Sequence, residues 1–282
     1  MAVTIRIDAH QHFWKLARGD YDWITPDLTK LNQDYLPQDL QPFLNKHHIQ
    51  GTIVVQAAPT IEETEYLLDL YDTNESIVGV VGWLEMDSSR FIEQFIKLSK
   101  RKGLIGIRPM IQDIPDDKWI LRQQVRENIA YLVDQDFPID LLVLPKHLPY
   151  VAELLEEFPK LRGVINHAAK PNIKDQDLNT WGQDLRKIAS YPGIMCKLSG
   201  LITEAAENWS KEDIKPVIDH VINCFGMNRV MFGSDWPVCL LAGSYHEVYE
   251  VLYDNLPINI TEKERQQLFG GNASRFYKLT NE

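Results

Sequence analysis

The sequence predicts an α/β fold, a single-domain (β/α)8 TIM barrel formed by residues 1–282. First, short runs rich in β-branched residues alternate along the whole chain with longer helical patterns. Second, runs such as TIVV and IVGVVGW are apolar almost throughout, as are the strands of a parallel sheet that is covered on both faces. Third, the chain lacks the GxGxxG or Walker motif that the rival doubly wound sheet usually brings.

Eight strands are expected from these runs. They are Thr4–Ala9, Gly51–Gln56, Ile77–Trp83, Leu104–Arg108, Pro138–Val143, Gly163–Asn166, Ile194–Lys197 and Arg229–Gly233. Eight strands in this alternating order favour a closed barrel, and a length of 282 residues suits one such domain.

The helical patterns between the strands have an apolar stripe. In Ile61–Thr73 the stripe contains Leu67 and Leu68, and Ser88 is expected to cap a helix over Ser88–Lys102. The other expected helices are Trp119–Gln135, Pro149–Phe158, Leu178–Ser190, Lys211–Phe225 and Tyr245–Leu256, with two short closing helices in Thr261–Tyr277. An irregular segment, Lys15–Leu36, is rich in Trp and Tyr. It could lie over the barrel mouth and line the pocket, or serve only as a hydrophobic patch that fixes the loop.

The net charge and the cysteine content indicate which partners and which cellular compartment to expect. The formal net charge of −11 argues against nucleic acid and against an anionic membrane surface, because both select basic patches. The three cysteines form no CxxC, and the N-terminus has no apolar signal region, so we expect a cytoplasmic protein. A small molecule is the expected partner, and a homodimer is the first expectation for an otherwise open oligomeric state.

Two histidines lie at the carboxyl end of the first expected strand. His10 and His12 are two residues apart, so both side chains should point towards the barrel axis. Two imidazoles at this spacing can bind one divalent metal or hold a carbonyl oxygen. Taken alone, the pair is equally compatible with ordinary polar residues at a strand end.

Two further ionisable residues follow the sixth and eighth strands, His167 and Asp235. An aspartate directly after the apolar MFG must face the mouth or be paired, although a turn residue of the Ser-Asp-Trp-Pro segment is the simpler interpretation of Asp235 alone. Barrel closure sets the eighth strand beside the first, so Asp235 should approach His10 and His12. The four side chains together predict a metal or water-activating site at the carboxyl end of the barrel.

Several longer motifs resemble the amidohydrolase-2 family of the amidohydrolase superfamily. They are IDAHQHFW, VVQAAPTIEETEYLL, INHAAKP, CKLSGLITEA, FGSDWPVCLLAGSY and GGNASRFY, and they extend over nearly the whole chain. Within the family they resemble the lactonase branch, which contains L-fucono- and L-rhamnono-lactonases and the pyrone-dicarboxylate lactonase. The joint presence of DAHQHFW, HAAKP, KLSGL and FGSDWPV makes the resemblance specific.

The resemblance implies a hydrolase in which Asp235 is the general base. It implies that His10, His12 and His167 are catalytic histidines, and that four more residues lie near the substrate: Arg108, Lys197, Glu85 and Trp236. One divalent metal, zinc, could be bound by His10, His12, His167 and Asp235, but catalysis without a metal stays open. The chain departs from the binuclear members of the superfamily, because it has no histidine after the fifth strand and no lysine at the end of the fourth.

The expected activity is therefore the opening of a small sugar-derived lactone, such as an L-rhamnono- or L-fucono-lactone, in carbohydrate metabolism. Asp235 would activate water, and the histidines or a metal would stabilise the oxyanion. Arg108 could hold a carboxylate or hydroxyl of the substrate, or form a salt bridge at the barrel rim. Two alternatives stay open: a metal-dependent decarboxylase of an aromatic or unsaturated acid on the same scaffold, and a non-catalytic metabolite-binding barrel.

Overall fold

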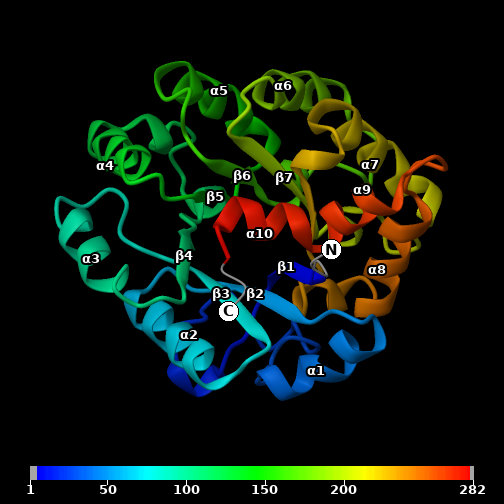
Figure 1. The fold of residues 1–282 in the computed structure, drawn as a ribbon, viewed down its shortest axis with the longest axis horizontal. Coiled ribbons are helices and arrows are strands. Elements are labelled where there is room, and N and C mark those ends of the chain that lie inside the picture. Colours follow the sequence, from blue (N-terminus) through cyan, green and yellow to red (C-terminus); the bar gives the residue numbers. More distant parts are fainter. Residues whose placement is uncertain (1–4, 280–282) are drawn as a thin grey trace.

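The computed structural model describes residues 5–279, in which eight parallel strands follow one another around a barrel (Figure 1). They are β1 (Ile7–Gln11), β2 (Gly51–Val55), β3 (Ile77–Gly82), β4 (Leu104–Ile107), β5 (Ile139–Leu141), β6 (Gly163–Ile165), β7 (Ile194–Leu198) and β8 (Val230–Phe232). The predicted (β/α)8 barrel is confirmed. Every expected strand is present to within a few residues at its ends, and Thr4 of the first lies outside the described residues.

Helices surround the barrel. They are α1 (Pro37–Lys46), α2 (Ile61–Thr73), α3 (Phe91–Leu98), α4 (Gln123–Asp134), α5 (Leu148–Glu157), α6 (Asn179–Ala189), α7 (Lys211–Phe225) and α8 (Tyr245–Asp254), followed by α9 (Glu262–Gln266) and α10 (Asn272–Tyr277). The expected cap at Ser88 is wrong. The Ser88 hydroxyl accepts from Arg90 N (3.2 Å) and its carbonyl from Phe91 N (3.2 Å), so it forms a turn before α3 begins. Among residues 5–279 no helix is both long and apolar enough to cross a membrane.

The barrel closes between β8 and β1 through the segment that follows β8. The amide of Asp235 donates to the carbonyl of His10 (2.8 Å), and the amide of His12 donates to the carbonyl of Trp236 (2.7 Å). These bonds bring the residues after β8 alongside the carboxyl end of β1. Closure therefore sets Asp235 beside both histidines, as the sequence predicts.

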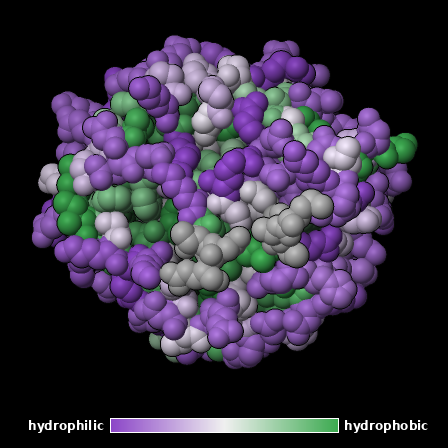
Figure 2. All heavy atoms as spheres, in the orientation of Figure 1, coloured by the Kyte–Doolittle hydropathy of each residue, from purple (hydrophilic) through white to green (hydrophobic). Residues whose placement is uncertain are grey.

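One end of the barrel is plugged by α10. Its Ala273, Phe276 and Tyr277 join the apolar cluster inside the barrel, and the carbonyl of Phe276 accepts from the side chain of Arg162 (3.0 Å), which directly precedes β6. Figure 1 shows α10 across the centre of the barrel, and the same face is largely hydrophilic in Figure 2. Because the amino end is closed, chemistry on a substrate requires the opposite, carboxyl end.

In the loop after β1, some aromatic residues form a hydrophobic patch that fixes the loop, and one is available to line the pocket. Trp14, Tyr21 and Tyr35 are buried, and Trp14 exchanges two backbone hydrogen bonds with Tyr35 at 3.0 Å. Their rings fix the loop by packing against one another. Trp23 is different, because 36% of its surface stays exposed. The loop thus has an apolar base and one tryptophan available at the mouth.

Candidate active site

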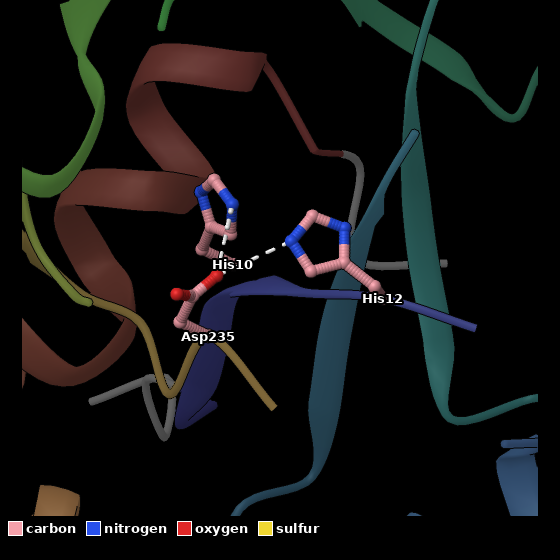
Figure 3. A group of neighbouring side chains, drawn as sticks. All are labelled: His10, His12 and Asp235. Atoms are coloured by element: carbon pink, nitrogen blue, oxygen red, sulfur yellow. Dashed lines mark hydrogen bonds and ion pairs between the residues drawn. The ribbon is translucent and has the colours of Figure 1, made fainter. Parts of the chain in front are cut away.

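The structure brings His10, His12, His167 and Asp235 together at the open end of the barrel. The Asp235 Oδ1 atom lies 3.2 Å from Nε2 of His12, 3.7 Å from Nε2 of His10 and 3.8 Å from Nε2 of His167. All four residues are at most 4% exposed. Figure 3 shows the carboxylate of Asp235 directed towards the rings of His10 and His12, which both come from the segment of β1.

A local irregularity in β1 presents the two histidines. The register with β2 shifts between Asp8 and Gln11, so the regular alternation of faces is broken there. As a result, Ala9 belongs to the interior apolar cluster while the neighbouring His10 contacts the ring of His167 at 4.5 Å between centroids. The Asp8 carboxylate fastens this segment, accepting from the amides of His10 (3.2 Å) and Ser234 (2.9 Å).

Backbone strain and close approach mark the other two residues. His167 and Asp235 have φ of 51° and 56°, a left-handed conformation that costs free energy in non-glycine residues and often occurs at functional sites. Gly200 has φ +59°, and a Cβ atom there would lie 2.6 Å from His167 Nδ1 and 3.0 Å from Asp235 Oδ2. Gly200 therefore leaves the space that His167 and Asp235 occupy.

Hydrogen bonds define the tautomer of His12. Its Nδ1 lies 2.7 Å from the carbonyl oxygen of Val55, which only accepts, so Nδ1 carries the proton. Burial lowers the pKa of His12 and lowers that of His167 to about 3, which makes both rings neutral at pH 7. In the neutral His12 ring, the lone pair of Nε2 therefore faces the Asp235 carboxylate.

This arrangement has the chemistry of a cation site. Burial raises the pKa of Asp235, but His167 and His12 outweigh it, so the pKa lies below its ordinary value and the group is ionised at pH 7. Neither ring nitrogen of His10 has a hydrogen-bond partner within residues 5–279. One ligand atom each from His10, His12 and Asp235 lie within 4.8 Å of one another. Two unpaired imidazole nitrogens and a carboxylate oxygen are suitable ligands for zinc.

Arg108 lies at the end of β4 and is 3% exposed. Its guanidinium donates to the carbonyl of Gln56, whose side chain in turn donates to the Arg108 carbonyl at 2.8 Å. Its Nε has no hydrogen-bond partner in the described part of the chain, and no carboxylate there lies within ion-pair distance of the guanidinium. The geometry does not match a rim salt bridge, and it leaves the buried Nε donor of the guanidinium unused.

The side chains of the other three predicted residues contact protein groups outside the four-residue cluster. Lys197 is fully buried and its Nζ lies 2.6 Å from Oδ2 of Asp140. Glu85 lies 3.5 Å from Arg90 with 40% of its side chain exposed. Trp236 is 1% exposed and packs against the rings of Phe13, Tyr35 and Phe43. The side chains of Lys197 and Glu85 thus pair with neighbouring protein groups, whereas the buried Nε1 of Trp236 has no hydrogen-bond partner in the described part of the chain.

Sequence reasoning missed two residues around the cluster. Ser199 lies with its Oγ 2.9 Å from Nδ1 of His167 and so orients that ring. Asp140 is the buried partner of Lys197, and a carboxylate inside the apolar run PIDLLV was the signal that could have found it. Ser199 carried no comparable signal, because a serine after a strand is common in loops.

A cavity of about 830 Å³ opens at the same end of the barrel. Its walls come from the loops after β1, β2, β3 and β4. The lining residues are Gly19, Asp20, Asp22, Trp23, Pro59, Thr60, Trp83, Leu84, Met86, Asp87, Pro109, Met110, Asp113, Ile114, Pro115, Trp119 and Arg122. Pro109 directly follows Arg108, so the cavity lies beside the cluster on the β2–β4 side of the mouth.

Comparison with known families decides the family. The amidohydrolase family model matches residues 7–279. The chain belongs to the amidohydrolase family. A curated relative, the L-fucono-1,5-lactonase of Burkholderia ambifaria, is 38% identical over 98% of this chain and 97% of its own length. The L-fucono-1,5-lactonase of Burkholderia multivorans is 35% identical over 98% of this chain and 97% of its own length.

A solved amidohydrolase structure agrees with this membership. A Burkholderia multivorans amidohydrolase, crystallised with bound HEPES, superposes with a TM-score of 0.93 at 35% identity, covering 98% of this chain and 100% of its own. A second crystal form of that amidohydrolase contains bound zinc and gives a TM-score of 0.92. The fold and family are thereby established for nearly the full length of the chain.

Proposed function

We propose that this amidohydrolase opens a sugar-derived lactone, with Asp235 activating water. The observation that carries the proposal is the ionised Asp235 carboxylate, buried among three imidazoles at the open end of the barrel. Burial lowers the pKa of all three histidines, including His10, so the rings are neutral at pH 7. The relatives named L-fucono-1,5-lactonase support the substrate class, because their likeness extends over the whole barrel. An L-rhamnono- or L-fucono-lactone is the first candidate substrate.

The reaction needs a base, an electrophile and a proton donor. Asp235 takes a proton from water as the oxygen forms a bond to the lactone carbonyl carbon. The negative charge that develops on the carbonyl oxygen is stabilised by a ring N–H of His10, which has no partner in the described part of the chain, or would be stabilised by a cation that the cluster holds. When the bond from the carbonyl carbon to the ring oxygen breaks, the protonated Asp235 returns its proton to the leaving oxygen. The product is a hydroxy acid, which ionises in solution.

A divalent metal suits this cluster. His10, His12 and Asp235 would hold the ion, because their ligand atoms converge and His10 otherwise leaves buried nitrogens unpaired. His167 completes the predicted set at 3.8 Å from Asp235 Oδ1. A bound zinc ion would act as a Lewis acid and lower the pKa of water. The zinc of the Burkholderia multivorans amidohydrolase supports this choice of metal.

Two further assignments follow from position and composition. The unused Nε donor of Arg108 is suited to a substrate oxygen, because Nη2 is already held by the carbonyl of Gln56 and orients the guanidinium. We extend the proposal to a cytoplasmic, single-domain enzyme of carbohydrate metabolism that forms a homodimer. Size-exclusion chromatography with light scattering would test the oligomeric state.

The rival activities have weaker support. Decarboxylation is represented by a 2,6-dihydroxybenzoate decarboxylase at 15% identity, and that likeness shows the fold alone. A non-catalytic binding barrel has no need of a strained aspartate beside three histidines. Carbon dioxide release would favour the decarboxylase, whereas acid release from a neutral lactone favours the lactonase.

A pH-indicator assay tests the proposal directly. Purified protein is presented with a panel of five- and six-membered aldonolactones and with 2-pyrone-4,6-dicarboxylate, each before and after chelation and zinc addition. We expect acid release from at least one aldonolactone, loss of that activity on chelation and recovery with zinc. Folded, zinc-supplemented protein that acidifies none of these solutions would refute the lactonase.

A further inference from the structure

The cavity beside the catalytic cluster is too large for a one-ring lactone. A six-membered sugar lactone has about a dozen non-hydrogen atoms. Even at the roughly 30 Å³ that a whole water molecule occupies in the liquid, these atoms would fill less than half of the 830 Å³. The lactone ring must also reach Asp235, which does not line the cavity. Most of this volume is therefore available to a further part of a larger ligand.

The cavity offers a fixed aromatic wall. The Trp23 indole N–H donates to the carbonyl of Ala57 at 2.8 Å, and the Trp14 ring packs edge-on against it at 5.6 Å between centroids. The Trp119 indole N–H donates to Asp87 at 3.0 Å. Rings held in this way lose little freedom when a ligand stacks on them. Trp23 is the ring with the most open surface, because 36% of it is exposed.

Acceptors outnumber donors around this wall. Four aspartates line the cavity (Asp20, Asp22, Asp87 and Asp113) against one cation, Arg122, which donates to Asp116 at 2.9 Å. Carboxylates accept hydrogen bonds from hydroxyl groups and repel anions. Exposed indole together with carboxylate oxygens suits an uncharged ring that carries hydroxyl groups.

We infer that the cavity binds a second, uncharged sugar ring, so that the preferred substrate is a lactone bearing a glycosyl group. This inference rests on the proposed lactonase function and specifies its substrate class. The lactone ring lies at Asp235 and the histidines, and the second ring stacks on Trp23 with its hydroxyl groups donating to the aspartates. No bond to the second ring changes during the reaction.

Steady-state kinetics on matched substrates test the inference. Each one-ring aldonolactone is compared with aldonolactones of disaccharides that carry one additional neutral ring. We expect a two-ring lactone with a kcat/KM above that of its one-ring counterpart. Trp23→Ala should lower kcat/KM for that substrate about tenfold, mainly through KM, and leave the one-ring reaction unchanged. A carboxylate on the second ring should slow the reaction.

Trp209→Ala is the matched control. Trp209 also fixes a loop through its indole N–H, which donates to Ala242 at 2.9 Å, but it does not line the cavity. It should leave both substrates unaffected. The inference is overturned if one-ring lactones are hydrolysed while every two-ring lactone is no better than its counterpart, or if Trp23→Ala slows both classes equally. Failure with all lactones would instead reject the lactonase itself.

Discussion

The buried carboxylates of Asp140 and Asp235 have different surroundings. Both oxygens of Asp140 have partners: Oδ1 accepts from Tyr277 at 2.6 Å, and Oδ2 accepts from Lys197 at 2.6 Å and Asn166 at 2.9 Å. Oδ1 of Asp235 lies 3.2 Å from Nε2 of His12, which carries no proton in the neutral ring, and His10 beside it has no hydrogen-bond partner in the described part of the chain.

The difference separates stability from chemistry. Asp140 ties β5 to β7 and to the plug helix α10, and has little capacity left for a ligand. Asp235 and the histidines keep unpaired nitrogen and oxygen atoms in a buried place, which costs folding free energy and leaves those atoms for a metal, water or substrate. At the carboxyl end of the barrel, the unpaired nitrogens of His10 beside the Asp235 carboxylate mark the site.

The largest effect is expected from Asp235→Asn. The amide keeps the shape of the side chain but cannot take a proton from water, so kcat should fall by about 10²–10⁴. The thermal midpoint should change little, because the amide keeps the shape of the side chain and the backbone hydrogen bond to His10 is unaffected. Lactone hydrolysis and differential scanning fluorimetry on the same preparation measure both. Full activity in this variant would exclude Asp235 as the base.

For Asp140→Asn, in contrast, we expect a loss of stability. It leaves the Lys197 ammonium buried without a countercharge, which should cost about 3–5 kcal/mol of unfolding free energy. The double variant Asp140→Leu with Lys197→Met removes both charges and should recover most of that loss. Urea denaturation provides the comparison. If the single variant is as stable as the wild type, the ion pair does not stabilise the barrel.

Glu63 is a third buried carboxyl, with only neutral partners, the amides of Ala57 and Ala58. Burial raises its pKa to about 8 from 4.5. A folded-state pKa above the unfolded value means that stability is fully present below pH 4.5 and is lost as the pH rises to 8. The loss of stability that comes from ionisation of Glu63 should be absent in Glu63→Gln. Urea midpoints of both proteins at pH 5 and pH 8 give the result, and parallel declines would contradict it.

The smallest effect is expected from Gly200→Ala. The added methyl group must displace the ring of His167, whose Nδ1 lies 2.6 Å from where the new Cβ atom would stand, and the residue keeps a left-handed φ. We expect the free energy of unfolding to fall by about 1 kcal/mol. The loss of kcat, expressed as a change in activation free energy, should be larger. Gly226→Ala is the control, because Gly226 also has a positive φ but open space around it. Equal activity losses in both variants would point to strain alone.

Much of the barrel could be predicted because its signals are local. The apolar runs predicted every strand, and the pattern of α2 predicted both of its ends, Ile61 and Thr73. The chemical cluster could be predicted in part, because His10, His12, His167 and Asp235 each follow a recognisable strand. The ion-pair partner of Lys197 could not be predicted, because Asp140 lies 57 positions away in the chain and reaches Lys197 only across the barrel.

The sequence by itself determined the alternation of strands and helices and the ionisable residues at the strand ends. These follow from hydrophobic periodicity, which neighbouring residues set. The tertiary structure alone decided which buried polar groups are paired, as at Lys197, and which remain unpaired, as at His10. It also decided that Trp23 faces a cavity while Trp236 is packed away. These outcomes depend on contacts between segments that are far apart in the sequence. Such contacts form only when the barrel closes.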